Sequence, residues 1–540
     1  MKSKYIKLTI VSVLTSIFLT SCLDDLNQDP IDPDSFTELD VFSNKTEAKM
    51  ALAKVYAALA LTGQVGPAGN PDITGIDEGS SQFTRMLFNL QELTTDTGVI
   101  GWEDPGLPNL HEMNWTSSNV FVEGMYYRLA QEISFTNSFI ANAEVLASDT
   151  DVQEFIAEAR FLRAYTYYNL MDLYANVPLL TEIQTELPFQ SNRTEIFAFV
   201  ESELLAIESL LKSSRSNEYA RVDATAAQAL LSRLYLNAET LIGQDKYTEC
   251  ITYSTKVFNS GYSVNTSDGN GSGSAYDELF LADNDTNGAQ NENIFVAAFD
   301  GIQSQTWGGS TFIVHASLGG TMDPTLSGVN GGWGGIRTTK ALVSKFESDE
   351  VNGNNEPISW VDNRAMFYVN EQNYEITTIA NAFEDGYAIH KFKNVDINGN
   401  AGSDSSGNYV DTDIPLIRVA EIYLNYAEAV KRGGSGGSEG EAVNKINELR
   451  ERAYGNSNGN ITTADLSLEF ILDERARELY WEGFRRTDLI RYDLFTTATY
   501  LWPFKGGVSS GTSVDSYRNI YPIPSNVINV NSNLEQNPNY

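Results

Sequence analysis

The chain has 540 residues, of which 42% are hydrophobic, so it is long enough to bury a large core. It has 72 acidic residues against 36 basic ones, which gives a formal net charge of −36. A surface this acidic repels phosphate backbones and therefore argues against a nucleic-acid partner. The three histidines are scattered, which argues against histidine-based catalysis and against a histidine-rich metal site (His111, His315, His390).

The N-terminus has the order of a secretory signal. Three lysines in the first seven residues precede an apolar stretch, residues 8–19, which is shorter than the roughly 20 residues that span a bilayer. The following Leu19-Thr20-Ser21-Cys22 resembles the lipobox of bacterial lipoproteins. We therefore predict a signal peptide over residues 1–21 and lipidation of Cys22, the alternative being an ordinary signal with a chance cysteine. Cys250 then has no partner, so no disulfide is expected.

The first helical pattern follows an Asp- and Pro-rich leader over residues 22–43. Asn44 and Glu47 are spaced as a capping box, which marks the start of a helix. Apolar residues then recur on one helical face (Ala48, Ala51, Leu52, Val55, Leu59).

The same period recurs over residues 117–147, 194–212, 246–258, 439–453 and 465–482. Some patterns form pairs joined by short turns, as when Ala224–Glu239 leads into Lys246–Phe258, and these resemble tetratricopeptide pairs. We predict a mainly α fold in which such pairs stack as an α–α superhelix, chiefly over residues 44–61, 117–260 and 415–495.

Glycine-, asparagine- and serine-rich segments separate the helical patterns, at residues 62–115, 260–413 and 496–540. Short apolar runs within them, Ile294–Phe299 and Thr311–Val314, are consistent with small strands. We predict one body over residues 44–540, with the repeats packed against this irregular region. Loops this long are usually functional.

Two tryptophans of the irregular region are framed by glycines. Trp307 lies in Gln-Thr-Trp-Gly-Gly and Trp333 in Gly-Gly-Trp-Gly-Gly, and Trp102 falls in a third tryptophan-bearing stretch. Glycine neighbours have no side chains to cover an indole, so it is presented at a loop surface or else caps the core from the loop. Exposed indoles would suit the apolar faces of sugar rings.

The segment that begins at Asp283 resembles the start of a calcium loop, with oxygen ligands at alternate positions and then a glycine. The twelfth position is an isoleucine, which excludes a complete EF-hand. We expect no cofactor to be required. Two interpretations of this segment stay open. One is a solvated polar turn. The other is a structural calcium site completed by distant oxygens (Asp283, Asp285, Asn287, Asp411, Asp413).

The charged run from Glu474 to Arg491 is tempting as a site, but such runs more often form ion pairs between packed helices, which is our interpretation.

An ordered set of motifs covers nearly the whole chain and resembles the SusD/RagB family of outer-membrane lipoproteins. The motifs are Glu158–Ala164, Arg418–Ala429, Ile446–Arg450, Glu474–Tyr480, Gly483–Leu489, Tyr521–Pro524 and Gln536–Tyr540. Further segments, including Gly69–Asp72 and Ala282–Asp285, resemble the family's starch-binding member.

The resemblance implies tetratricopeptide-like units beside an irregular glycan-binding region. It also implies an outer-membrane, surface-exposed, lipid-anchored protein that passes starch or maltooligosaccharides to a SusC-like TonB-dependent transporter. Trp102, Trp307 and Trp333 match the positions of the family's aromatic glycan site, and Arg85 matches an arginine that hydrogen-bonds sugar hydroxyls. The chain departs from the pattern over residues 100–105, where a tryptophan and an asparagine are replaced.

Three alternatives remain at this point. The chain could bind a different glycan in the same way. A glycoside hydrolase needs two carboxylates about 5–10 Å apart, and 72 acidic residues single out no such pair, so we predict a non-catalytic protein. A helical scaffold that binds only protein would explain the repeats but not the glycine-framed tryptophans.

Overall fold

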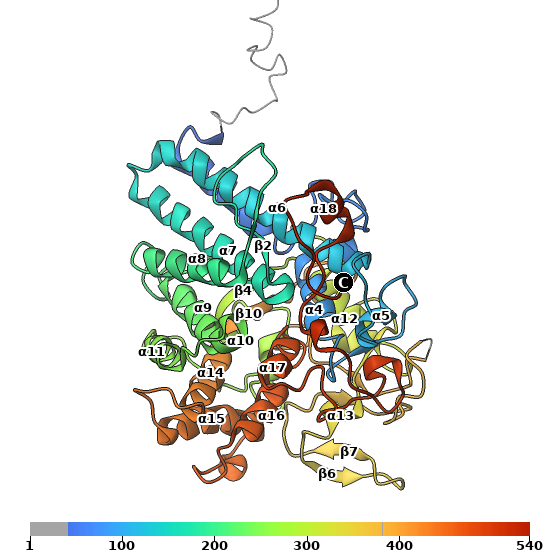
Figure 1. The fold of residues 1–540 in the computed structure, drawn as a ribbon. Coiled ribbons are helices and arrows are strands. Elements are labelled where there is room, and N and C mark those ends of the chain that lie inside the picture. Colours follow the sequence, from blue (N-terminus) through green and yellow to red (C-terminus); the bar gives the residue numbers. More distant parts are fainter. Residues whose placement is uncertain (1–40, 381) are drawn as a thin grey trace, which may run out of the picture.

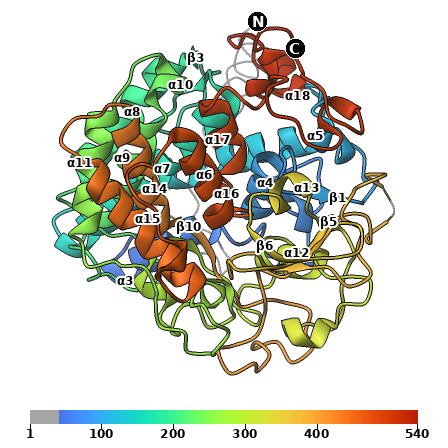
Figure 2. The same ribbon diagram turned by 90° about the horizontal axis from the view of Figure 1, so that it is seen from below.

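The computed structural model describes residues 41–380 and 382–540, and it is mainly helical (Figure 1). Helices form a row along one side of the molecule, and a loop-rich lobe with short strands lies beside them (Figure 2). The predicted signal peptide, Cys22 and nearly all of the predicted leader lie outside the described residues. Within those residues, no helix combines the length and the apolar character that a membrane span requires.

The first described helix, α3 (Lys45–Ala57), begins where the sequence predicts it. The Asn44 side chain accepts hydrogen bonds from the backbone N–H groups of Thr46 and Glu47, which caps the helix. The Glu47 carboxylate makes no return bond, so only the asparagine half of the predicted capping box forms.

The row of helices is continuous because each member packs on the next. It runs through α6 (Val120–Ala143), α7 (Thr150–Tyr174), α8 (Arg193–Ile207), α9 (Ala224–Leu236), α11 (Tyr247–Phe258), α14 (Val419–Lys431) and α15 (Glu439–Tyr454). Each helix buries an apolar stripe against its neighbours. Two chain segments distant in sequence thus join one row, since α11 packs on α14 across the loop-rich segment.

Shorter helices complete the fold. They are α4 (Phe83–Gln91), α5 (Pro108–His111), α10 (Ala238–Ile242), α12 (Gly309–Ala316), α13 (Lys340–Val343), α16 (Leu468–Leu479), α17 (Arg485–Arg491) and α18 (Ser525–Val530). Cys250 is buried in α11 and has no disulfide partner in the described residues.

The strands of the described residues form five two-stranded antiparallel sheets. They are β1 (Val99–Ile100) with β5 (Ile336–Arg337), β2 (Val177–Pro178) with β3 (Gln190–Ser191), β4 (Asn293–Ala297) with β10 (Ile414–Arg418), β6 (Ser348–Val351) with β7 (Pro357–Trp360), and β8 (Phe367–Tyr368) with β9 (Ala388–Ile389). β4 confirms the predicted strand near Ile294.

The predicted strand at Thr311–Val314 is wrong, because this run lies within helix α12 and is buried on all sides. A short, mainly apolar run has no periodicity that separates a strand from a buried helix.

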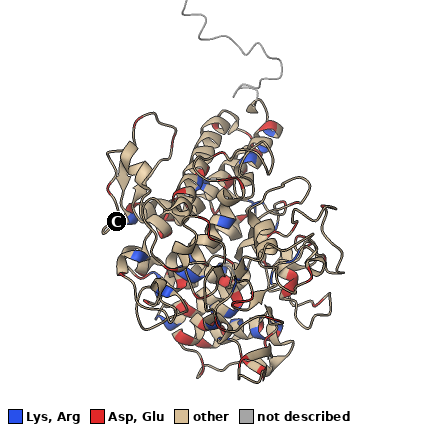
Figure 3. Cartoon of the chain, turned by 90° about the vertical axis from the view of Figure 1, so that its right-hand side faces the viewer, with Lys and Arg blue, Asp and Glu red and all other residues tan. Residues whose placement is uncertain are grey.

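The interior is also held by buried ion pairs, and Figure 3 shows acidic and basic residues intermingled along the helices. Arg418 pairs with Glu292 (2.8 Å), Glu478 (2.6 Å) and Glu482 (2.6 Å), all of them buried. The interpretation of the charged run as structural is therefore confirmed. Removing one partner of such a pair strands a buried charge and costs about 3–5 kcal/mol.

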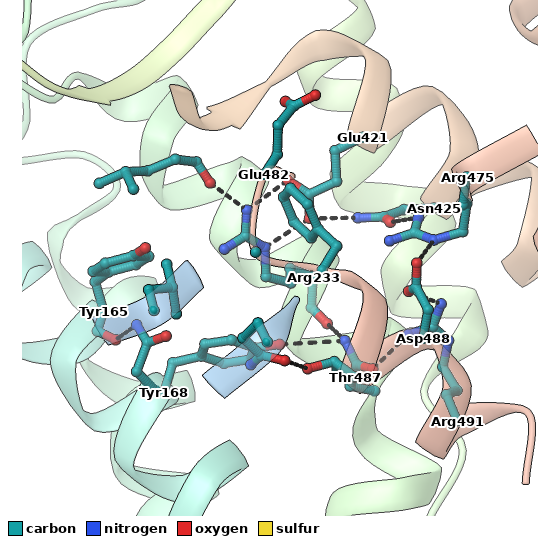
Figure 4. Close-up of a pocket in the computed structure, with 17 residues that line it drawn as sticks. Tyr165, Tyr168, Arg233, Glu421, Asn425, Arg475, Glu482, Thr487, Asp488 and Arg491 are labelled. Carbon is teal, nitrogen blue, oxygen red and sulfur yellow. Dashed lines mark hydrogen bonds and ion pairs between the residues drawn. The ribbon is translucent and has the colours of Figure 1, made fainter. Parts of the chain in front are cut away.

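A small polar cavity lies within this ionic region, between the helices (Figure 4). Its lining includes the buried pairs Arg233–Glu421 (2.6 Å) and Arg475–Asp488 (2.8 Å). The cavity volume is ≈ 20 Å³, which is room for about one water molecule. It is therefore too small to hold a sugar.

Candidate functional site

Four aromatic residues from separate loops meet in the loop-rich lobe. The ring centroids of Trp102 and Trp333 lie 6.3 Å apart, those of Trp333 and Trp307 6.1 Å, and those of Trp307 and Tyr409 4.8 Å. All four side chains are half-buried. We call this series the aromatic arc, and it brings together the three tryptophans that the sequence singled out.

Short strands and close backbone approach set the arc's central pair. Trp102 follows β1 and Trp333 precedes β5, and these two strands pair with each other. The Gly101 N–H donates to the Gly335 carbonyl (2.9 Å), and the Trp102 indole N–H donates to the Trp333 carbonyl (3.4 Å). A Cβ at Gly335 would lie 2.6 Å from the Trp102 ring, so this glycine is required for the indole to lie against the backbone.

A second glycine, Gly79, leaves room for Trp307 to pack against the backbone. A Cβ at Gly79 would lie 2.7 Å from the Trp307 Cβ, so only glycine allows the two backbones to approach this closely. Gly335 and Gly79 therefore allow neighbouring backbone to pack directly on Trp102 and Trp307.

Helix α12 forms the floor of the arc. The Phe312 ring meets Trp102 edge-on at 5.9 Å, and the His315 ring stacks on Trp333 at 4.7 Å with an interplanar angle of 13°. The Trp333 N–H donates to the His315 carbonyl (2.7 Å), which ties the tryptophan's backbone to the same helix.

Arg85 reaches the arc from α4. Its guanidinium carbon lies 4.2 Å from the Phe312 ring centroid and 5.9 Å from that of Trp102. Its side chain makes no hydrogen bond to the described residues, and its Nε is buried without a partner. Burial lowers the pKa of Arg85 to about 10, so the group stays charged at neutral pH. It offers unused donors beside the aromatic rings.

A buried glutamate braces the Trp307 end. Glu78 Oε1 accepts hydrogen bonds from the hydroxyls of Thr62 (2.6 Å) and Thr306 (3.0 Å), while Oε2 has no partner in the described residues. Burial raises the pKa of this carboxyl. Because Thr306 directly precedes Trp307, Glu78 joins the loop ahead of α4 to the loop that carries the tryptophan.

Sequence reasoning missed Tyr409, His315 and Glu78. Tyr409 had a usable signal, because it is an aromatic residue in a Gly-Asn-rich segment, as Trp333 is. The other two had none, since their roles depend on loops that meet only in the folded chain.

The predicted calcium ligands already have hydrogen-bond donors. Asp283 accepts from the Asn287 side chain (3.1 Å) and the Ile397 N–H (3.1 Å). Asp413 accepts from the Phe299 N–H (2.7 Å) and the Tyr219 hydroxyl (2.8 Å).

Two other predicted ligands, Asp285 and Asp411, lie near Asp413. Burial raises the pKa of Asp413 to about 7, with a contribution from the nearby charges of Asp285 and Asp411. Asp411 in turn accepts from the Gly301 N–H (2.6 Å). In residues 41–380 and 382–540, no group of three or more Asp, Glu, His or Cys side chains is arranged to hold a metal. The calcium site therefore stays a prediction.

Comparison with known proteins bears on the whole chain. Residues 359–540 match a family model described as the SusD family, and residues 88–236 match one described as starch-binding and associating with the outer membrane. The starch-binding protein SusD of Bacteroides thetaiotaomicron is 37% identical, and the match covers all of both chains. SusD-like protein P38 of Formosa agariphila is 24% identical over 91% of this chain and 92% of its own.

Solved structures agree on the fold. A SusD homologue from Bacteroides thetaiotaomicron gives a TM-score of 0.69 at 19% identity, with 94% of this chain and all of that chain covered. Surface glycan-binding protein A from Bacteroides fluxus gives 0.67 at 20% identity, with 92% and 100% covered.

Proposed function

The chain belongs to the SusD family, and we propose that it binds starch or maltooligosaccharides on the aromatic arc and delivers them to an outer-membrane transporter. Members of this family are non-catalytic glycan binders that associate with the outer membrane, so the chain is a binding protein and not an enzyme. The specific glycan, the site and the transporter are the proposal.

The shape of the arc is the observation that supports the proposal most directly. Successive rings from Trp102 through Trp333 and Trp307 to Tyr409 are tilted by 42°, 51° and 46°. Rings tilted in this way cannot form one flat platform, whereas they can follow a ligand that turns between sugar units. A helical α-glucan turns in this way, while an extended flat glycan does not.

Arg85 complements the rings. Sugar rings have apolar faces and a rim of hydroxyls, so a site needs aromatic surface together with planar, forked donors. The Arg85 guanidinium is fixed over Phe312 and has no competing partner among the described residues. It is the group we assign to the hydroxyls of a sugar stacked on Trp102 or Trp333.

Affinity at a single arc is expected to be weak. About 4 kcal/mol of net binding free energy corresponds to a millimolar dissociation constant. A polymer that presents many equivalent sugars, together with a transporter that holds the released end, would raise the effective affinity without new contacts.

Three finer features accompany this proposal. The packed helical pairs are tetratricopeptide-like units, as their sequence pattern suggests. Cys22 is the acylated anchor that holds the chain at the cell surface. A SusC-like TonB-dependent transporter receives the glycan, and it should co-purify with the full-length chain from detergent-solubilised outer membranes.

Calorimetry tests the proposal. The protein from residue 23 onward is titrated with maltoheptaose, with cellohexaose as the flat-glycan control. Saturable heat with maltoheptaose alone supports an α-glucan receptor. Heat only with other glycans would support the alternative of a SusD-like receptor for a different glycan. Release of reducing ends from starch would contradict the non-catalytic assignment and favour a glycoside hydrolase.

A further inference from the structure

One residue connects the two halves of the aromatic arc from below. His315 lies in the last turn of α12, and its side chain is almost fully buried, with a relative exposure of 1%. Its ring lies flat against the inner face of Trp333 (4.7 Å, 13°). A sugar stacked on the outer face of Trp333 would therefore leave His315 as the residue that supports the indole from behind.

The two ring nitrogens of His315 point to two different loops. Nδ1 lies 2.6 Å from the carbonyl oxygen of Gly331, two residues before Trp333. Nε2 lies 3.0 Å from the carbonyl oxygen of Asn408, which precedes Tyr409. A single imidazole thus ties the loop that carries Trp333 to the loop that carries Tyr409.

The number of protons on the His315 ring decides whether it can donate hydrogen bonds to both carbonyl oxygens. Both neighbours are carbonyl oxygens, which only accept hydrogen bonds. Neutral imidazole has one N–H and could donate to only one of them, leaving a nitrogen lone pair opposed to the other oxygen. The imidazolium has two N–H groups and satisfies both contacts.

We propose that His315 is a positioning residue for the glycan site, and that its protonated ring holds Trp333 and Tyr409 in the arc. The proposal rests on the function proposed above. It predicts that glycan affinity rises as the pH falls through the titration of His315, because the ligand selects the arrangement that the imidazolium stabilises.

The surroundings of the ring shift its pKa in opposite directions. Burial lowers the pKa of His315 below its usual value, and the carbonyls of Gly331 and Asn408 act in the opposite direction. Among the described residues, no charged side chain contributes to this balance; the two carbonyls are the polar contacts of the imidazole, and the Trp333 ring stacks on it. At neutral pH the ring of the free protein is therefore mostly neutral, and it donates a hydrogen bond to only one of the two carbonyls.

The test is the pH dependence of maltoheptaose affinity between pH 8 and pH 5, measured by calorimetry. We expect the wild-type affinity to increase by about tenfold, the size of one hydrogen bond to a charged group. Binding at pH 6 should also take up protons, which appears as a dependence of the heat on the ionisation enthalpy of the buffer. His315→Phe keeps the stack on Trp333 without any donor, and His315→Gln keeps a single donor. Both are expected to bind more weakly with a flat pH profile.

His390→Gln is the matched control, because it removes a different histidine, one that makes no side-chain hydrogen bond to the described residues, and it should keep the wild-type profile. Circular dichroism checks that each variant is folded. A wild-type affinity that is flat with pH would overturn the proposal, as would a wild-type pH slope retained in His315→Phe.

A second measurement separates this inference from the proposed function. Tryptophan fluorescence of the sugar-free protein is followed over the same pH range, since protonation beside Trp333 changes the indole's surroundings. A step that His315→Phe abolishes supports the tie even if maltoheptaose does not bind, in which case only the proposed ligand fails. The absence of a step that depends on His315 would overturn the positioning role.

Discussion

Trp333 is the position where a single substitution should harm glycan binding most. Its ring touches both other tryptophans of the arc and stacks on His315, so Trp333→Ala removes one sugar platform and the support of its neighbours. A half-buried indole offers one free face, roughly 60 Å² of the 150–250 Å² that an aromatic side chain can bury. At about 25 cal/mol per Å², covering that face contributes about 1.5 kcal/mol, or roughly tenfold in affinity.

The assay is calorimetry with maltoheptaose on the wild type and on Trp333→Ala. From a millimolar starting point, a loss of about tenfold or more abolishes measurable heat. Trp360→Ala is the matched control, because Trp360 is a half-buried tryptophan that packs on Phe367 at 4.9 Å and takes no part in the arc. Unchanged affinity in Trp333→Ala, or an equal loss in Trp360→Ala, would refute the assignment of the arc as the binding surface.

Three further predictions concern the other groups. Arg85→Met keeps the packing on Phe312 but removes the donors, so maltoheptaose affinity should fall about tenfold at unchanged thermal stability; an unaltered dissociation constant would exclude Arg85 from sugar binding. Glu478→Gln leaves Arg418, Arg364 and Arg452 without a shared carboxylate and should lower the free energy of unfolding by about 3–5 kcal/mol in urea titrations, while the folded fraction binds glycan normally. Burial opposes ionisation of Glu428, but the charges of Arg491 and Arg432 outweigh it and lower its pKa to about 2. Because the folded pKa of Glu428 lies below its unfolded value of about 4.3, the ion pairs of Glu428 contribute their full stabilisation above that pH. This contribution is lost as the pH falls toward 2. Urea midpoints that do not decrease between pH 5 and pH 3 would contradict this reading of the ionic interior.

The helical row could be predicted from the sequence because its apolar stripes recur at a local period. Patterns such as 246–258 and 439–453 correspond closely to α11 and α15. The run Thr311–Val314 could not be assigned correctly, because it is buried on every side within α12 and its apolar residues show no period.

The candidate site was predictable only in part. The glycines beside Trp307 and Trp333 marked these residues, because close backbone approach leaves a local trace in the sequence. Tyr409 and His315 have a weaker signal in the sequence. The contact that joins their loops, between His315 Nε2 and the Asn408 carbonyl oxygen, links residues 93 positions apart. The calcium hypothesis depended on residue types alone. It stays a prediction; in the fold those carboxylates also accept hydrogen bonds from backbone and hydroxyl donors, which composition alone does not show.

A crystal structure of the protein with maltoheptaose tests the central claim most directly. We predict glucose rings stacked on Trp102, Trp333 and Trp307 along a curved path, with the Arg85 guanidinium donating to sugar hydroxyls. Maltoheptaose bound at another surface, with the four rings of the arc left uncovered, would contradict the claim.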